Sequence, residues 1–303
     1  MAIDEESLQT APAFAGLDSL APHIEAARFI VIPVPYEATT EWLTGTRHAP
    51  ERIIHSSRLL ELYDWELDAD ISQAGIATTA ALEPVLSGPE AMVAEVRRQT
   101  ASWLAQGKTP VIIGGEHTIT LGAVQAMRER YADLSVLHLD AHADLRDSYL
   151  GTRCSQATVM RRVHECCPIT QVGVRSLSTA ERRYIEERGT RTVFWPPEDA
   201  DWVEAAVASL GDHVYVTIDA DVFDSGLLPC VGTPEPGGPG WQDIKTLLES
   251  VARRKAVVGF DVVELSPEGR IGDVCAYSIA RLIYHFIGCI HHHTTQQEAA
   301  RNG

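Results

Sequence analysis

Acidic and imidazole side chains alternate along one short stretch of the chain. Residues 137–145 read Leu-His-Leu-Asp-Ala-His-Ala-Asp-Leu, so that small residues separate Asp140, His142 and Asp144. These three follow the mostly apolar run 134–139, which is typical of a buried strand, and alternation at a strand end points every second side chain to one side. Two carboxylates and an imidazole gathered there need a partner, and a bound cation accommodates several carboxylates at once. The stretch therefore predicts part of a metal site.

Three further strand ends carry similar side chains. At the first, a Gly114-Gly115 pair permits a tight turn before His117. At the second, Asp219 and Asp221 alternate with other residues after an apolar strand, and at the third Glu264 is the last residue of a strand. In an open parallel sheet, ligands bind outside the carboxyl ends of the strands, and all four signals are expected on that edge. Any one of them alone would be typical of a turn, a helix cap or a surface residue. It is their combination that predicts a metal site.

The predicted ligand set also indicates the metal. Two imidazoles with four carboxylates and no thiolate suit hard to borderline cations such as Mn²⁺ better than structural Zn²⁺. Six ligands are too many for one metal that must keep a position open for water. They suit two metals that share carboxylates, an arrangement that makes hydroxide available at neutral pH. Hydrolysis of a poor electrophile is the chemistry that we expect.

Alternating strands and helices must position these residues. Strands rich in Val and Ile are expected over residues 29–32 (ended by Pro33), 109–113, 134–139, 169–174, 192–195, 213–218 and 256–262. Helices are expected over residues 51–62, 89–106, 120–131, 155–164, 179–188, 199–210, 241–253 and 274–290. This α/β alternation predicts a mostly parallel sheet with helices on both faces.

The chain shows no Pro/Gly/Ser-rich linker that would divide it. We expect an N-terminal extension over residues 1–26, a single domain over residues 27–290 and a polar, frayed tail over residues 291–303. The three histidines of that tail are typical of a solvated chain end rather than of a metal site.

Composition excludes several classes of partner. The 303 residues include 25 Lys+Arg against 42 Asp+Glu, a formal charge of −17, and no basic block could follow a nucleic-acid backbone. The acidic N-terminus lacks the features of a signal peptide, and no apolar run approaches the roughly 20 residues that span a bilayer. The six cysteines show no CxxC spacing. We therefore expect a cytoplasmic protein with reduced thiols and no membrane partner.

Five motifs resemble the ureohydrolase family, which comprises arginases, agmatinases and their relatives, and they look most like bacterial and archaeal agmatinases. The motifs are Gly-Gly-Glu-His-Thr at 114–118, Asp-Ala-His-Ala-Asp at 140–144, Asp-Ala-Asp-Val-Phe-Asp at 219–224, Gly-Thr-Pro-Glu-Pro-Gly-Gly at 232–238 and Phe-Asp-Val-Val-Glu at 260–264. The resemblance runs from about residue 29 to residue 290. It implies an arginase-type α/β/α fold with three layers and about eight strands. It also implies a centre of two Mn²⁺ per chain, with Ni²⁺ as an alternative, and a homo-oligomer, either a trimer or a hexamer.

The resemblance further implies a role for each ligand. The six ligands would form two overlapping sets, namely His117, Asp140, Asp144 and Asp219 for one metal, and His142, Asp140, Asp219 and Asp221 for the other. Asp140 and Asp219 would bridge the two metals. A bridging hydroxide would attack the guanidino carbon of a small guanidino substrate while Glu264 binds its guanidinium, and the tetrahedral intermediate would release urea and an amine. A resonance-stabilised guanidinium does require a strong nucleophile and a carboxylate that fixes the cation.

Gln156 departs from the family's pattern. It stands where relatives commonly carry a histidine that is thought to shuttle protons, and glutamine donates hydrogen bonds but does not titrate near neutral pH. We expect Gln156 to contact the substrate, so that another group or water protonates the leaving amine, or turnover is slow, or the substrate differs. His164, about two helical turns further on, is a weak substitute and is expected to be structural.

The substrate loops point away from L-arginine. Residues 145–153 lack the Ser-Gly-Asn pattern with which arginases hold the α-groups of the amino acid, and the segment 46–50 has His-Ala where the family's entrance loop has Phe-Gly or Asn-Gly. Agmatine is the leading substrate, with guanidinobutyrate, guanidinopropionate and guanidine as alternatives. Two rival hypotheses are a non-catalytic subunit, which Gln156 would permit, and a mononuclear deacetylase-type relative, which would need fewer carboxylates.

Overall fold

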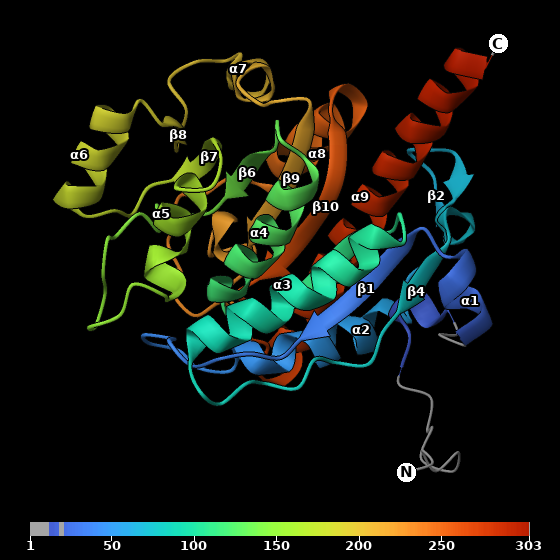
Figure 1. Ribbon diagram of the computed structural model, residues 1–303, viewed down its shortest axis with the longest axis horizontal. Helices are drawn as coiled ribbons and strands as arrows, with labels where there is room; N and C mark the ends of the chain where they lie inside the picture. Colours follow the sequence, from blue (N-terminus) through green and yellow to red (C-terminus); the bar gives the residue numbers. More distant parts are fainter. Residues whose placement is uncertain (1–11, 18–20, 303) are drawn as a thin grey trace.

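Eight parallel strands form the central sheet of the computed structural model, which describes residues 12–17 and 21–302 (Figure 1). In their order across the sheet the strands are β4 (Ile76–Thr78), β1 (Phe29–Val34), β5 (Thr109–Gly114), β10 (Ala256–Val263), β9 (His213–Asp219), β6 (Ser135–Leu139), β7 (Ile169–Val174) and β8 (Arg191–Phe194). Every neighbouring pair is parallel. The sheet confirms the expected fold class.

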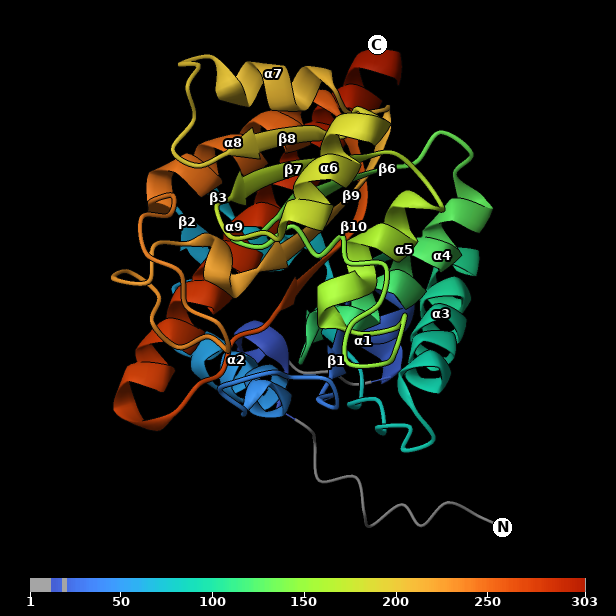
Figure 2. The same ribbon diagram turned by 90° about the vertical axis from the view of Figure 1, so that its left-hand side faces the viewer.

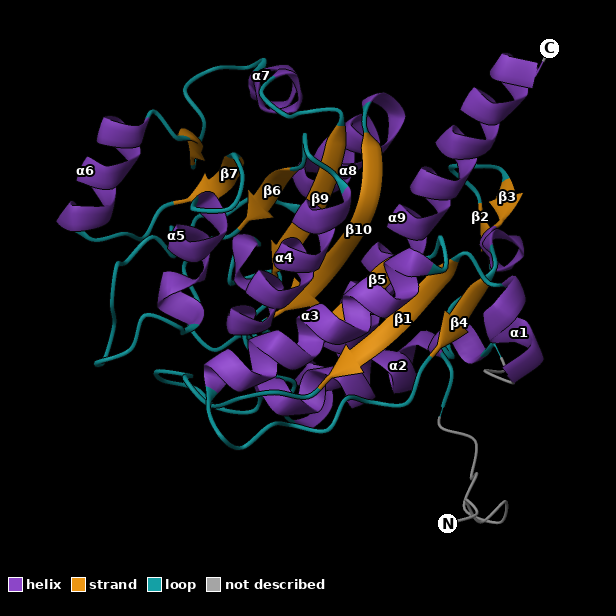
Figure 3. Cartoon of the chain, in the orientation of Figure 1, coloured by secondary structure: helices purple, strands orange, loops and turns teal. Residues whose placement is uncertain are grey.

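Helices cover both faces of this sheet, as Figures 2 and 3 show. The helices are α1 (Ala21–Ala26), α2 (Ala49–Ser57), α3 (Pro89–Ala105), α4 (Thr120–Arg130), α5 (Val159–His164), α6 (Thr179–Arg188), α7 (Trp202–Ala208), α8 (Trp241–Arg254) and α9 (Gly269–Asn302). Alternate strand residues face opposite layers, so that Ile30 belongs to the apolar core that includes residues of α3 and α4, whereas Val31 belongs to the core that includes residues of α2, α8 and α9. Two apolar cores, one on each face, therefore hold the strands rigid.

The strand order explains how the site is assembled. The four strands whose ends carry the predicted site residues, β5, β10, β9 and β6, are adjacent in the middle of the sheet. Because all four run in the same direction, their carboxyl ends share one edge. The fold therefore gathers residues that lie up to 147 positions apart in the chain.

Several expected boundaries differ from the structure. Pro33 lies inside β1 rather than ending it, because β4 stops opposite Val31 and the missing N–H of Pro33 faces the space beyond β4. The short strands β4, β2 (Tyr63–Asp64) and β3 (Ala69–Asp70) were not expected, since two or three residues leave no detectable periodicity. Part of the predicted N-terminal extension is packed, because Phe14 is fully buried; residues 1–11 and 18–20 lie outside the described chain.

Helix α9 is longer at both ends than expected. It begins at Gly269 and continues to Asn302, so the predicted frayed tail is helical over the residues that the structure describes. No Pro or Gly interrupts residues 291–302, and its Gln, Glu and Ala residues favour helix. By length and composition residues 269–295 could cross a membrane, contrary to the expectation from the sequence. Most of this segment is buried against the protein, however, as in the core helix of a globular fold.

Candidate metal centre

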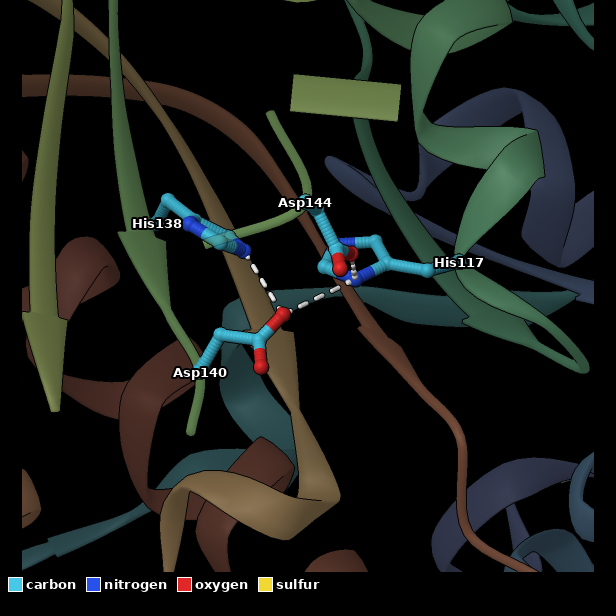
Figure 4. Close-up of side chains that lie close together, drawn as sticks. All are labelled: His117, His138, Asp140 and Asp144. Atoms are coloured by element: carbon cyan, nitrogen blue, oxygen red, sulfur yellow. Dashed lines mark hydrogen bonds and ion pairs between the residues drawn. The ribbon is translucent and has the colours of Figure 1, made fainter. Parts of the chain in front are cut away.

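His117 stands at the centre of the gathered side chains. It follows β5 after Gly115, where a Cβ atom would lie 2.0 Å from the carbonyl oxygen of Tyr36, so that only glycine fits. The His117 Nδ1 atom lies 3.3, 3.2 and 3.3 Å from carboxylate oxygens of Asp140, Asp144 and Asp219, and Figure 4 shows the first two converging on the ring. The structure thus brings together the four residues that were predicted to hold one metal.

The hydrogen bonds behind His117 fix which ring nitrogen faces these carboxylates. Thr217 Oγ1 donates its only hydrogen to Asp261 Oδ1 at 2.5 Å. His117 Nε2 lies 2.9 Å from Thr217 Oγ1 and must therefore be the donor in that hydrogen bond. In the neutral ring, the buried Nδ1 then presents a lone pair to three carboxylates. Desolvation lowers the pKa of His117, but the three carboxylates together raise it well above its usual value, so without a metal a proton occupies this place. A lone pair among anionic oxygens is repulsive unless a cation lies between them, and a metal ion meets that need.

The two oxygens of Asp140 face two different groups. Oδ2 lies on the His117 side, whereas Oδ1 lies 3.5 Å from Nδ1 of His142. His142 Nδ1 is also 2.9 Å from Asp221 Oδ2, so His142, Asp140 and Asp221 form a second cluster of ligand atoms. Asp140 therefore occupies the position between the clusters that a bridging ligand requires. Asp219 contacts His117 and accepts a hydrogen bond from the Asp221 backbone.

His138 is a site residue that sequence reasoning missed. The Gln171 amide must direct its nitrogen toward the Ala143 carbonyl, and the same nitrogen donates to His138 Nδ1 at 2.9 Å. His138 Nε2 therefore carries the hydrogen and donates to Asp140 Oδ2 at 2.8 Å (Figure 4). Such partners orient metal ligands. The alternation of residues 138, 140, 142 and 144 was the signal that could have revealed it.

Burial disfavours the charged form of two carboxylates in the site, Asp144 and Asp219. Desolvation, helped by the charge of Asp140, raises the pKa of Asp144 to about 7. Desolvation and the charges of Asp221 and Asp140 likewise raise the pKa of Asp219 well above its usual range. Protein groups alone therefore disfavour the ionised forms of Asp144 and Asp219, and a bound divalent cation would reverse these two shifts. The residues present fit a metal centre.

Glu264 lies beside the clusters at the end of β10. Its Oε1 accepts a hydrogen bond from the His117 backbone at 2.6 Å, and its own N–H donates to the Gly115 carbonyl. Its φ is +63°, a conformation that L residues rarely adopt and that marks many functional sites. Burial and the nearby Glu116 raise the pKa of Glu264 well above its ordinary value, and a bound guanidinium would favour the ionised form.

Glu116 was also missed from the sequence, although it lies within the first motif. It is fully buried and accepts hydrogen bonds from the backbone of Ala38, from the Thr39 backbone and hydroxyl, and from the Thr118 hydroxyl. Thr39 Oγ1 in turn accepts a hydrogen bond from the Gln156 backbone. Glu116 therefore anchors one wall of the cavity.

A cavity of about 220 Å³ opens onto the candidate metal centre. Its lining includes Gln156 and Glu264 together with His142, Asp144, Asp219 and Asp221. Gln156 thus lies where the sequence places it. His164 does not line the cavity and hydrogen-bonds Tyr184, in keeping with its expected structural role. The segment 46–50 does not line it either, because the Arg47 backbone and side chain both bind Glu37.

Arg175 fixes the loop that follows β9. Its guanidinium donates hydrogen bonds to the backbone carbonyls of Gly173, Asp221, Val222, Phe223, Glu235 and Pro236. The loop carries Asp221, so the position of this ligand depends on Arg175. No sequence pattern could reveal this role, because the partners of Arg175 are backbone atoms.

Comparison with known proteins agrees with this geometry. Residues 27–289 match the model of the arginase family. An N(1)-aminopropylagmatine ureohydrolase of Synechocystis is 39% identical over 91% of this chain and 92% of its own length, and an agmatinase of Pyrococcus horikoshii is 35% identical over 88% and 93%. The agmatine ureohydrolase structure of Thermoplasma volcanium superposes with a TM-score of 0.84 at 29% identity, covering 92% of this chain and 96% of that one. The chain belongs to the arginase family, as one of its agmatinase-like ureohydrolases.

Proposed function

We propose that this chain is a binuclear metal hydrolase that cleaves a guanidino amine to urea and an amine. One observation carries the proposal: the unpartnered Nδ1 of His117 faces three carboxylates. A divalent cation bound there would coordinate Nδ1 and neutralise the carboxylates, and Asp140 lies between this cluster and the second one. The oxygen and imidazole ligands suit Mn²⁺, with Ni²⁺ as the alternative.

The residues divide the chemical work between them. Two divalent cations held by the clusters would supply a hydroxide nucleophile at neutral pH. The Glu264 carboxylate, buried beside them, would bind the guanidinium and hold its carbon in place for attack. Gln156 could hydrogen-bond the substrate but cannot donate a proton to the leaving amine near neutral pH.

The names of the relatives suggest two substrates. Relatives from Synechocystis and Pyrococcus horikoshii are named for aminopropylagmatine and for agmatine, respectively. Both compounds carry a guanidinium at one end and one or more amines beyond a short alkyl chain. We propose agmatine or its N1-aminopropyl derivative as the substrate, ahead of guanidinobutyrate, guanidinopropionate and guanidine.

A urea-release assay with the Mn²⁺-loaded chain tests this function. We expect urea from agmatine or N1-aminopropylagmatine, little from L-arginine, and about two metal ions per chain. Asp140→Asn should lower both metal affinity and turnover by more than the roughly 10- to 100-fold that is typical of residues that only orient ligands. Asp147→Asn is the matched control, because Asp147 is an exposed carboxylate on the adjacent loop and contacts Arg153 and Arg162.

Other outcomes would identify the rivals. Two bound metals without urea release from any guanidino compound would favour a non-catalytic subunit, which Gln156 would permit. One metal per chain would contradict the binuclear centre and favour a mononuclear relative.

A further inference from the structure

The outer part of the cavity carries charges that the metal centre does not use. Beyond the ligands and Glu264, its charged lining residues are Glu41, Arg146 and Glu181. Two carboxylates against one guanidinium leave this part of the cavity with a net negative charge. The two carboxylates, Glu41 and Glu181, differ in how far their charge is already satisfied by other protein groups.

Glu181 is committed to holding the protein together. Its side chain is 5% exposed and accepts hydrogen bonds from the backbone and hydroxyl of Ser178, at the start of α6, and from the Leu145 backbone. Arg146 is the cation nearest to it, with Nε 3.9 Å from a Glu181 oxygen. The charge of Glu181 is therefore satisfied by three donors and a neighbouring cation.

Glu41 has no comparable set of partners. Among the described residues its carboxylate accepts one hydrogen bond, from the Tyr149 hydroxyl, and forms no salt bridge. The Arg146 guanidinium lies over the face of the Tyr149 ring, 4.7 Å from its centre, rather than against Glu41. Glu41 is thus the carboxylate of the cavity wall whose charge remains unpaired.

The position of Glu41 is nevertheless defined. Two residues before it, Thr39 is bound to the buried Glu116 and to the Gln156 backbone. Tyr149 holds it from the opposite loop, 108 residues further along the chain. Glu41 itself is exposed to solvent, but its hydrogen bond with Tyr149 and the anchored backbone before it limit the conformational entropy that it loses when a cation binds.

We propose that Glu41, oriented by Tyr149, binds the distal ammonium of the substrate and so selects guanidino amines over guanidino acids. This inference rests on the proposed function, since it assumes that Glu264 binds the guanidinium in the same cavity. A distal carboxylate would face the unpaired charge of Glu41 and be repelled. A distal ammonium would complete its hydrogen bonds and neutralise it.

Paired substrates test the role of Glu41. Agmatine and 1-butylguanidine share the guanidinium and the four-carbon chain, but only agmatine has the amine. Glu41→Gln should raise KM for agmatine about tenfold, leave kcat within about twofold, and change kcat/KM for 1-butylguanidine little. Tyr149→Phe should give a smaller change in the same direction. Asp147→Asn, which removes a carboxylate outside the cavity lining, should change neither substrate.

Two results would overturn the inference. An equal loss on agmatine and 1-butylguanidine would show that Glu41 supports the loop rather than the ammonium, and an unchanged KM for agmatine would show that the ammonium binds elsewhere. If the wild-type chain bound metal but released no urea, the proposed function would fail first. Calorimetric titration of the Mn²⁺-loaded wild type and Glu41→Gln with both compounds would then decide the role of Glu41 separately. Tighter binding of agmatine that Glu41→Gln abolishes would support it, and equal binding would refute it.

Discussion

Gln156 lies in the cavity on a backbone that is anchored independently of its side chain. It begins a short 3-10 helix, and its N–H donates to Thr39 Oγ1 at 3.2 Å. Because the anchor is the backbone, a different side chain can be placed there without moving the wall. The position therefore offers a direct test of how the leaving amine acquires its proton.

Substitution Gln156→His should raise kcat for the preferred guanidino amine, because an imidazole can act as a general acid near neutral pH. We expect at least about a tenfold rise and a new dependence on a group with a pKa near 6.5. Urea release measured from pH 6 to pH 9 would show both. Gln156→Leu is the size-matched control without a titratable group, and an equal response of the two variants would contradict the shuttle argument.

The sequence predicted which acidic and histidine side chains gather at the sheet edge, but not the residues that orient them. Asp140, His142 and Asp144 are visible because their alternation is local to one strand end. Glu41 and Arg175 are not visible, since their partners lie many residues away and some are backbone carbonyls. Neither residue belongs to a periodic pattern that could reveal it.

The loop between β9 and α8 is the element on which the second cluster depends. The loop contains Asp221 and Thr233, and Thr233 Oγ1 donates to Asp221 Oδ2 at 3.2 Å. Most of the carbonyls that accept hydrogen bonds from Arg175 belong to this loop. A single guanidinium therefore replaces the backbone hydrogen bonds that these carbonyls would form in a helix or a strand.

Substitution Arg175→Lys should loosen this loop while keeping the charge. An ammonium has three donors without the planar fork, so several carbonyls would lose their partner, and we expect about 2 kcal/mol less stability. Denaturant unfolding would measure this loss, and metal titration should show weaker binding at the second cluster. Arg97→Lys, in an exposed pair with Glu129, is the control and should cost about 0.5 kcal/mol or less. Unfolding curves that shift equally would contradict the role of Arg175.

Strand and helix assignments succeeded where the pattern was long and apolar. β7 and α6 agree with the expected ranges at both ends, and α6 has the Ser178 and Glu181 cap that sequence rules describe. β4 was missed because its three residues form a strand only through pairing with β1. Such edges are decided by tertiary contacts that no local window contains.

At the scale of the whole molecule, a second charge network joins α9 to β2, more than 200 residues earlier in the chain, and to α8. His285 Nδ1 lies 2.8 Å from Asp64 Oδ2, and its Nε2 lies 3.0 Å from Glu249 on α8. Lys245 and Arg281 add positive charge around the same carboxylates. Lys245 also pairs with Glu66. The network belongs to the fold rather than to the catalytic cavity.

This network predicts how stability depends on pH. Burial lowers the pKa of His285, but the hydrogen bonds and charges of Asp64 and Cys289 together outweigh burial and raise this pKa to about 10. Burial likewise raises the pKa of Asp64, but His285, the Leu67 backbone and Arg281 together outweigh burial and lower it to about 2. The His285 contribution is complete below its unfolded value of about 6.5 and is lost as the pH rises toward 10. The Asp64 contribution is complete above about 4 and is lost as the pH falls toward 2.

Substitution His285→Gln should remove the part of this dependence that lies between pH 6.5 and pH 10. We expect the wild type to lose unfolding free energy across that range in excess of the variant, by at most about 1.4 kcal/mol for each unit by which the His285 pKa is raised. Urea denaturation at half-unit steps of pH would measure the difference. His213→Gln is the control, because His213 pairs with Asp133 at the surface. Parallel curves for the wild type and His285→Gln would contradict the assignment.

The position of β10 has a consequence for how the protein is made. This strand is the last of the sheet in the chain, yet it lies fourth in the sheet, between β5 and β9. During synthesis one edge of β5 and one edge of β9 remain unpaired until residue 263 has left the ribosome, because among the described residues only β10 pairs with both strands. His117, which follows β5, stays apart from Asp140 and Asp219 until then, whereas Asp140, His142 and Asp221 already lie at the ends of the neighbouring strands β6 and β9. Assembly of the cluster around His117 is therefore tied to the synthesis of β10, while the second cluster can form before it.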